Sequence, residues 1–209
     1  MTSATSRKQK AAETEAALKA AARRVFARQG YLNTKITDIT AEAGRAAGSF
    51  YNHFAGKEEL LEALLVDMFA EADEGVTEPG HDQDFSKRSA VRWHVAHFWR
   101  FYQEHLPEMV ALRQAAMVNE DLGRRLRQLT VADQRHLGGH LANVANLPGD
   151  PELVTSAMTA LMDQFAYTWL VAGGTGRDLP DDEAIDLLTD FVHRAITGGT
   201  ALSGQALSG

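Results

Sequence analysis

Apolar residues recur at steps of three and four along almost the whole chain, and no stretch alternates apolar and polar residues over a useful length. The first spacing places side chains on one face of an α-helix, whereas a half-buried strand would need the second. Glycine or proline ends most of these stretches, and both residues are frequent helix boundaries. The pattern therefore predicts an all-α fold of about nine helices.

Three helices are expected before residue 57 and six after it. The first three are expected at Glu13–Gln29, Thr37–Ala43 and Ala47–Phe54, with Thr34 or Thr37 as the cap of the second. The others are expected from Lys57, over Phe85–His105, from Pro107 to near Met117, and over Glu120–Leu147, Glu152–Ala172 and Asp181–Thr197. Asp150 is a candidate N-cap, and Gly138-Gly139 could divide the helix that contains them into two pieces.

Composition excludes several classes of protein. The length of 209 residues suits one large domain or two small ones, and 44% hydrophobic residues suffice for a core. Without cysteine the chain has no disulfide framework, no thiolate metal site and no cysteine nucleophile. Neither a secretory signal nor an apolar run long enough for a membrane span is present. We expect a cytoplasmic protein with no membrane partner.

Charge is distributed unevenly along the chain. Residues 1–60 contain ten Lys/Arg and six Asp/Glu, a net charge of +4, while residues 61–209 contain eleven and twenty-two, a net charge of −11. The overall charge of −7 argues against a protein that coats nucleic acid without regard to sequence. A basic first part nevertheless indicates that this part alone meets a polyanion.

The helices expected at Thr37–Ala43 and Ala47–Phe54 have the arrangement of a helix-turn-helix. The turn Gly44-Arg45-Ala46 joins them, and the second would enter the major groove of DNA. Gly48 has no side chain, so the helix can approach DNA closely. Phe50 and Phe54, four residues apart, are expected in the core of this small unit.

The same residues carry a family resemblance. The motifs are Ile36-Thr37-Asp38-Ile39-Thr40-Ala41-Glu42-Ala43-Gly44, Gly48-Ser49-Phe50-Tyr51-Asn52-His53-Phe54 and Lys57-Glu58-Glu59-Leu60. Their types and spacing resemble the DNA-binding region of the tetracycline-repressor (TetR) family over Thr14–Leu64. The rest of the chain agrees with that family only in helical content and length.

The resemblance implies a homodimeric, ligand-responsive regulator that binds double-stranded operator DNA and releases it when a small molecule binds the C-terminal domain. A repressor is favoured over an activator. The implied domains are residues 1–56 for DNA binding, with a loose basic arm at 1–12, residues 57–198 for effector binding and dimerisation, and a tail at 199–209. No enzyme activity and no cofactor are expected.

The candidate DNA-binding residues lie around the turn and the recognition helix. Ser49 and His53 are expected toward bases, and Tyr51 and Lys57 toward phosphate. The whole set is Thr37, Arg45, Ala47, Gly48, Ser49, Tyr51, Asn52, His53 and Lys57. Many family members have a serine at the position of Ala46 and a basic residue at that of Ala47. Ala46 cannot cap the recognition helix with a side-chain oxygen, a loss of about 1 kcal/mol.

Aromatic and sulfur-containing residues after residue 90 are candidates for an effector pocket. Such side chains suit a largely apolar ligand, and a few polar groups would orient it. The candidates are Trp93, His97, Phe101, Met109, Arg113, Met117, Met162 and Phe165. Ordinary core packing is the alternative for each of them.

The last two helices carry more apolar surface than one chain needs. A four-helix bundle formed by two chains would bury it, and the candidate interface residues are Met158, Trp169, Leu188, Val192 and Ile196. Packing within one chain is the alternative.

A different class of function depends on two histidines. His136 and His140 are four residues apart, a spacing that suits a metal ligand pair on one helix. They are the basis of the alternative interpretation, a helical-bundle enzyme or a metal-responsive regulator. A solvated helix face explains the same spacing, so no metal site is assigned.

Overall fold

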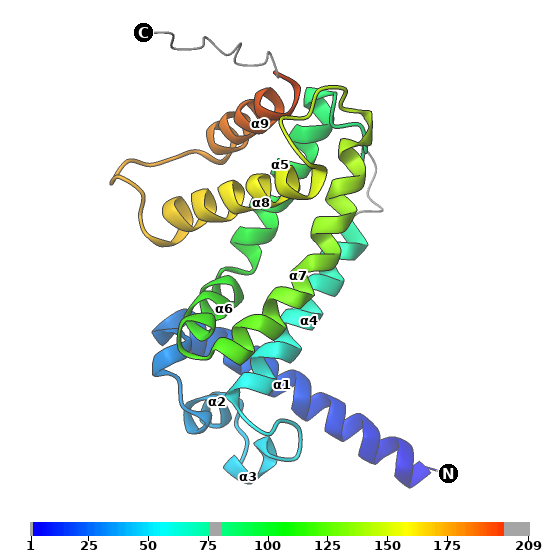
Figure 1. Cartoon of the computed structure of the whole chain (residues 1–209). Helices are drawn as coiled ribbons and strands as arrows, with labels where there is room; N and C mark the ends of the chain where they lie inside the picture. Colours follow the sequence, from blue (N-terminus) through cyan, green and yellow to red (C-terminus); the bar gives the residue numbers. More distant parts are fainter. Residues whose placement is uncertain (1, 76–80, 199–209) are drawn as a thin grey trace, which may run out of the picture. The chain divides into compact units, whose positions relative to one another are not determined.

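The computed structural model describes the backbone of residues 2–75 and 81–198, and their side chains apart from residues 2–6, 72–75 and 129–136. Nine α-helices and no strand occur in this part of the chain, as the sequence predicts (Figure 1). The predicted tail at 199–209 lies outside the described residues. No described helix is both long and apolar enough to cross a membrane.

The chain forms two compact units. The first comprises residues 1–75 and 104–129, and the second residues 76–103 and 130–209. The first unit contains α1 (Thr2–Asn33), α2 (Ile36–Glu42), α3 (Ala47–Phe50), α4 (Lys57–Gly75) and α6 (Leu106–Val118). The second contains α5 (Arg88–Glu104), α8 (Pro151–Ala166) and α9 (Asp181–Thr197), and α7 (Glu120–His140) belongs partly to each.

These units divide the chain differently from the boundary expected after residue 56. Helices α4 and α6 join the three N-terminal helices, because α1 packs along α6 and α4 contacts α6. A boundary in function need not coincide with a boundary in packing. The separation of a DNA-binding part at 1–56 from an effector part at 57–198 therefore stays a prediction.

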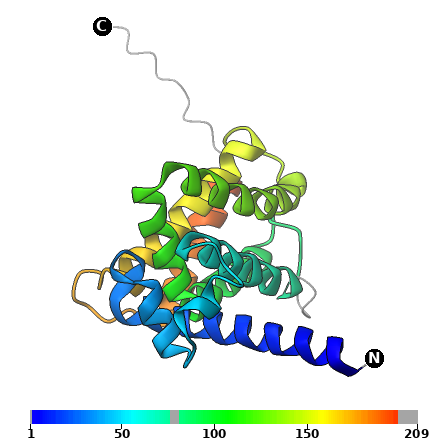
Figure 2. The ribbon, with the colours of Figure 1, turned by 90° about the horizontal axis from the view of Figure 1, so that it is seen from below.

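Helix α1 corrects the expectation of a loose basic arm. The helix begins at Thr2, and its N-terminal part extends away from the other helices of its unit (Figure 2). Arg7, Lys8 and Lys10 are exposed on this extension. The run of small and polar residues is compatible with a helix because alanine, lysine, arginine and glutamine favour that conformation.

Gly30 ends the regular part of α1, as the sequence predicts. Its backbone has φ 74° and ψ 163°, a conformation open to glycine at little cost. The amide N–H groups of Tyr31 and Leu32 then donate to the Oε1 atom of Gln114 in α6, with N···O distances of 2.8 and 3.4 Å. A side chain from α6 thus satisfies backbone donors at the break.

Helix α6 is also joined to α1 by an ion pair whose carboxylate is buried. The carboxylate of Glu108 is 1% exposed and contacts the Nε atom of Arg23, whose side chain is 37% exposed. Burial of a lone carboxylate is unfavourable, so Glu108 depends on its partner. The neighbouring Arg24 makes an exposed pair with Glu42 instead, at 2.6 Å.

The second unit is held by polar contacts between α5 and α9. The indole Nε1 of buried Trp99 and the amide Nε2 of Gln103 both donate to Asp181 Oδ1 at 2.8 Å, which fixes the first residue of α9. Further along α9, Arg88 pairs with Asp190 at 2.7 Å and Arg92 with Asp186 at 2.8 Å.

Three helix boundaries test the sequence predictions in this unit. Asp150 caps α8 as predicted, accepting from the amides of Glu152 and Leu153 at 2.9 and 3.4 Å. Helix α7 runs through Gly138-Gly139 without a break and ends at His140, so both the division into two pieces and the predicted end at Leu147 are wrong. After α8 the chain continues as a π-helix over Tyr167–Val171.

The pair of Arg23 and Glu108 gives a prediction about stability. Arg23→Ala leaves a buried carboxylate without its ion-pair partner and should lower the free energy of unfolding by about 3 kcal/mol, the lower end of the range for buried pairs. Arg24→Ala is the matched control and should cost far less, since its pair is exposed and screened by solvent. Urea unfolding followed by circular dichroism measures both. Equal losses in the two variants would contradict the role given to Glu108.

Candidate nucleic-acid interface

Helix α2 begins one residue earlier than predicted, and neither Thr34 nor Thr37 caps it. Lys35 is the N-cap, and its backbone N–H donates to Asp38 Oδ2 at 2.9 Å. Gln29 in α1 donates to the same oxygen at 3.0 Å, and these bonds lower the pKa of Asp38. Asp38 therefore joins the start of α2 to α1. At the other end of α2, Gly44 has a φ of 62° in the turn that follows the helix.

The recognition helix is shorter than predicted. Regular helix covers only Ala47–Phe50, and the chain continues to Phe54 in turns, with the amides of His53 and Phe54 bonded to the Phe50 carbonyl at 2.9 and 3.0 Å. The N-cap Ala46 makes no side-chain capping bond. Phe50 and Phe54 are buried with ring centroids 5.7 Å apart, and their burial confirms their predicted place in the core.

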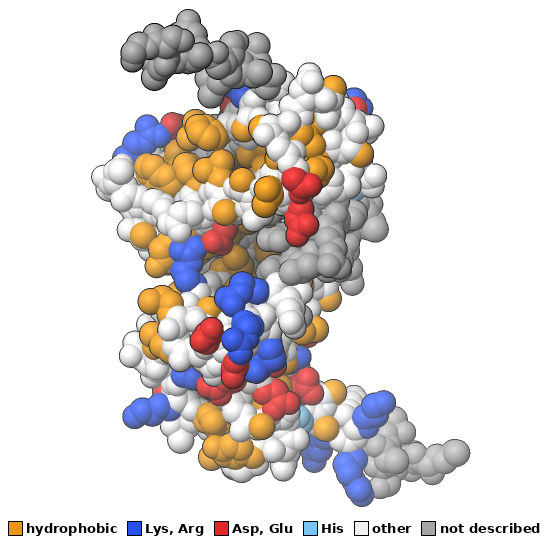
Figure 3. Space-filling view, in the orientation of Figure 1, with side chains coloured by type: hydrophobic (Ala, Val, Ile, Leu, Met, Phe, Trp, Pro, Cys, Tyr) orange, Lys and Arg blue, Asp and Glu red, His pale blue; other side chains and the backbone are white. Residues whose placement is uncertain are grey.

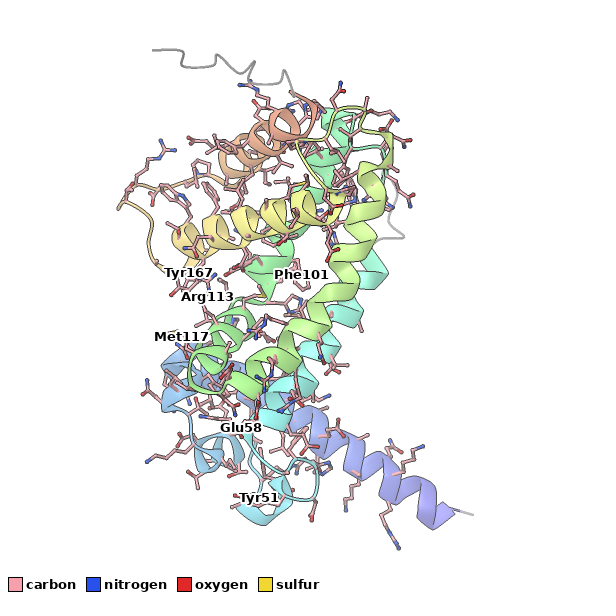
Figure 4. All side chains as sticks on the ribbon, viewed as in Figure 1. Tyr51, Glu58, Phe101, Arg113, Met117 and Tyr167 are labelled. Carbon is pink, nitrogen blue, oxygen red and sulfur yellow. The ribbon has the colours of Figure 1, made fainter. Side chains whose placement is uncertain are left out.

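The side of α3 that faces away from this core carries most of the candidate DNA-binding residues. Tyr51 is 61% exposed and projects outward from α3 (Figure 4). Thr37, Arg45, Ala47, Gly48 and Asn52 are exposed as well, and Ser49 is half-buried. A Cβ atom added to Gly48 would meet no other heavy atom within 4 Å. The surface of α3 at Gly48 is thus open, and backbone is accessible there.

Lys57 has a role that the sequence analysis did not predict. Its Nζ atom donates to the carbonyl oxygens of Tyr31 and Thr34 at 2.7 and 2.9 Å, and lies 4.2 Å from the centroid of the Tyr31 ring. Burial lowers the pKa of this ammonium and raises the pKa of the Tyr31 phenol. Lys57 therefore joins the start of α4 to the end of α1, and we leave it out of the proposed phosphate contacts.

The side chain of His53 is too little exposed, in this conformation, to contact a base. Its side chain is 12% exposed, and its Nδ1 atom lies 3.9 Å from Glu15 Oε2 in α1. This contact accounts for the position of the ring against α1. The predicted base contact of His53 would require the side chain to turn outward.

The candidate effector residues belong to both compact units. Trp93, His97, Phe101, Met162 and Phe165 lie in the second unit, where the rings of Trp93 and His97 stack and Phe165 contacts Trp99 and Trp169. Met109, Arg113 and Met117 lie on α6 in the first unit. Met117 is 80% exposed, which does not suit a pocket wall within this unit. Their common role as effector ligands stays a prediction.

Three predicted interface residues on α9 face inward instead. Leu188, Val192 and Ile196 are buried within the chain, and so is Met158 on α8, while Trp169 is half-buried. Since a buried side chain cannot be the surface of an interface, this part of the prediction is wrong. The sequence analysis missed the second stripe of α9, in which Leu187, Phe191 and Ala195 follow one another at steps of four and are exposed.

Gly48 gives a test of the open surface at α3. Gly48→Val should leave the fold and its thermal stability unchanged, because an added Cβ atom meets no other heavy atom within 4 Å in the free protein. It should weaken DNA binding by at least about tenfold, since the branched side chain would stand between α3 and the groove. Circular dichroism and fluorescence anisotropy with selected DNA measure the two effects. Undiminished affinity in a folded variant would show that DNA docks elsewhere.

Comparisons with known proteins identify this part of the chain. The profile of the family described as "Bacterial regulatory proteins, tetR family" matches residues 18–64, which include α2, α3 and the start of α4. The HTH-type transcriptional regulator TtgR of Pseudomonas putida is 29% identical, in an alignment that covers 91% of this chain and 92% of TtgR. The HTH-type transcriptional repressor DhaR of a Mycobacterium species is 43% identical over 47 residues, 22% of this chain and 24% of DhaR.

Solved structures extend the likeness to the whole fold. The fatty acid degradation regulator FadR of Bacillus halodurans superimposes with a TM-score of 0.70 at 18% identity, covering 90% of this chain and 96% of FadR. A TetR-like transcriptional regulator from Rhodococcus sp. RHA1 gives a TM-score of 0.66 at 23% identity, over 87% and 94% of the two chains. With the helix-turn-helix described above, these matches show a transcriptional regulator rather than an enzyme, in which residues 18–64 have the DNA-binding domain of the tetR family of bacterial regulatory proteins.

Proposed function

We propose that the chain is a repressor that binds a specific operator as a homodimer and is released by a small, largely apolar effector. Such a protein would act in the cytoplasm, where bacterial DNA lies. The observation that carries the proposal is the exposed surface of α3 around Gly48, on a helix-turn-helix whose other side is fixed by Phe50 and Phe54. A helix that is packed against the core on one side and exposed on the other suits insertion into a major groove.

We expect some residues of this surface to contact bases and others to contact phosphates. Ser49 and Asn52 carry short hydrogen-bonding groups suited to base edges, and Tyr51 presents a phenol that suits a phosphate oxygen. Arg45 in the turn and the exposed Arg7, Lys8 and Lys10 on α1 add positive charge for the DNA backbone. Thr37 and Ala47 would lie at the edge of the contact.

Effector release requires two states of the protein with different affinities for DNA. Helix α6 suits a link to the DNA-binding helices, because it carries the candidate effector residues Met109, Arg113 and Met117 and also Gln114, which holds the end of α1. An effector that moves α6 by a small distance would disturb the bonds from Tyr31 and Leu32 to Gln114. The two recognition helices of a dimer would then lose the spacing of successive major grooves, about 34–36 Å.

The exposed face of α9 is the surface that we propose for dimerisation. Hydrophobic side chains gather over α8 and α9 (Figure 3), and Leu153, Leu161, Leu187 and Phe191 are among the exposed ones. Leu187, Phe191 and Ala195 lie together on one side of α9 with Asp190 and Arg194. Pairing two such faces would bury them in a four-helix bundle, which keeps the helices of the original prediction and changes the residues.

Two substitutions on α3 separate base contact from phosphate contact. The operator is first identified by selecting genomic fragments with the purified protein. Tyr51→Phe should weaken binding to the operator and to unrelated DNA equally, by about 3- to 10-fold. Ser49→Ala should change the preferred bases and leave unrelated DNA nearly unaffected. If both variants lower binding to every sequence by the same factor, the assignment of roles is wrong.

One charge on α9 tests the dimer surface. Phe191→Asp places a carboxylate in the proposed interface and should raise the dimer dissociation constant by at least about 30-fold, the effect of about 2 kcal/mol at a central contact. Val66→Asp, an exposed apolar residue of α4, is the matched control and should leave the dimer intact. Sedimentation velocity over a range of concentrations measures both. A stable Phe191→Asp dimer would contradict the proposed surface.

A further inference from the structure

Three histidines from separate segments of the second unit meet at one point. His81 precedes α5, His94 lies in its second turn and His140 is the last residue of α7. One ring nitrogen of each lies within 4.8 Å of those of the other two. The Nε2 atoms of His81 and His94 are 3.2 Å apart. Since the three residues are far apart in the sequence, no helical spacing could reveal this cluster.

A hydrogen bond to the backbone orients the central ring. The Nδ1 atom of His94 lies 2.9 Å from the carbonyl oxygen of Ala90. A carbonyl only accepts, so Nδ1 carries the proton and the Nε2 of the neutral ring has a lone pair directed at His81. Histidines that bind metal ions regularly have their other nitrogen held in this way.

Aromatic side chains surround the cluster. The ring of Phe85 lies 4.8 Å from that of His94 and 5.2 Å from that of His140, and Trp93 lies 4.9 Å from His81. The amide of Phe85 donates to the His140 carbonyl at 3.3 Å, which fixes the chain between His81 and α5 to the end of α7. His140 is buried, whereas His81 and His94 are half-buried. The rings are thus held by packing around His140, while His81 and His94 keep partial access to solvent.

We propose that His81, His94 and His140 bind a first-row divalent transition-metal ion, with zinc as the first candidate. Two nitrogen ligands at 2.0–2.1 Å from a tetrahedral ion lie about 3.3 Å apart, close to the 3.2 Å between His81 and His94. The ring nitrogen of His140 lies within 4.8 Å of the other two nitrogens. A shift of about 1.5 Å, which side-chain rotation can supply, would bring it to the same separation of about 3.3 Å. A water molecule would complete the tetrahedron.

Imidazole nitrogen is a favourable donor for zinc, copper and nickel, while calcium and magnesium prefer oxygen. The ligand set is different from the His136 and His140 pair considered from the sequence, with which it shares only His140. The side chain of His136 lies outside the described residues. Bound metal would connect the segment before α5 with α5 and with the end of α7, and so stabilise the second unit whether or not DNA is bound.

Titration of the full chain with zinc tests the site. The protein is prepared without a histidine tag, stripped with chelator, and titrated with zinc chloride by calorimetry and with cobalt(II) by visible absorption. We expect one ion per chain, the absorption of tetrahedral cobalt and a higher melting temperature with zinc. His81→Gln and His94→Gln should each weaken zinc binding by at least about 100-fold, since changes in supporting residues alone cost 10- to 100-fold.

His97→Gln is the matched control. His97 lies one turn after His94 on α5 and stacks on Trp93, but it is not part of the cluster, so its loss should leave zinc affinity unchanged. His81 and His94 are chosen for substitution because they are only half-buried, and circular dichroism verifies the fold. Zinc binding weaker than about 100 μM in the parent protein would overturn the proposal. So would full zinc affinity in His94→Gln, or an affinity lost with His136→Gln and kept with His81→Gln.

Discussion

The placement of the DNA-binding helices depends on how the ammonium of Lys57 joins the end of α1 to the start of α4. It donates to two carbonyls at the end of α1 and lies against the ring of Tyr31, whose hydroxyl donates to Glu58 Oε1 at 3.4 Å. Between these two anchored ends the chain forms α2 and α3. A helix of four residues has little stability of its own, so its position is set by the contacts of its neighbours.

A second set of contacts connects the same region to α6. Gln114 accepts from the amides that follow Gly30, and Glu108 pairs with Arg23, which lies before that break in α1. Both residues of α6 are polar groups that reach α1, and a buried charge tolerates little displacement from its partner. A movement of helix α6 would therefore displace α1 and with it the helix-turn-helix. This gives the proposed ligand-dependent release a physical path within the first unit.

The sequence predicted those features that depend on local spacing and turn chemistry. The all-α class, the end of α1 at Gly30, the cap at Asp150, the bounds of α9 and the burial of Phe50 and Phe54 all follow from side chains within a few residues of one another. Helix ends were less predictable. Helix α2 starts after Lys35, where the Asp38 carboxylate accepts from the Lys35 amide and from Gln29 of α1, and no threonine cap is involved.

Features that depend on packing between distant segments could not be predicted. The sequence predicted Lys57 as a phosphate ligand. Its actual partners are the backbone carbonyl oxygens of Tyr31 and Thr34, and a pattern of side chains cannot indicate backbone partners. On α9 two apolar stripes were present, and spacing alone does not tell which one faces the core. The histidine cluster joins three segments through the fold, while the pair that spacing indicated as metal ligands was His136 and His140.

The most direct measurement of the central claim is amide hydrogen exchange of the full chain, with and without saturating operator DNA, resolved by mass spectrometry. The account predicts slower exchange on DNA binding in peptides that cover residues 45–54, and no direct protection of the exposed face of α9. Unchanged exchange over residues 45–54, with protection confined to other parts of the chain, would contradict it.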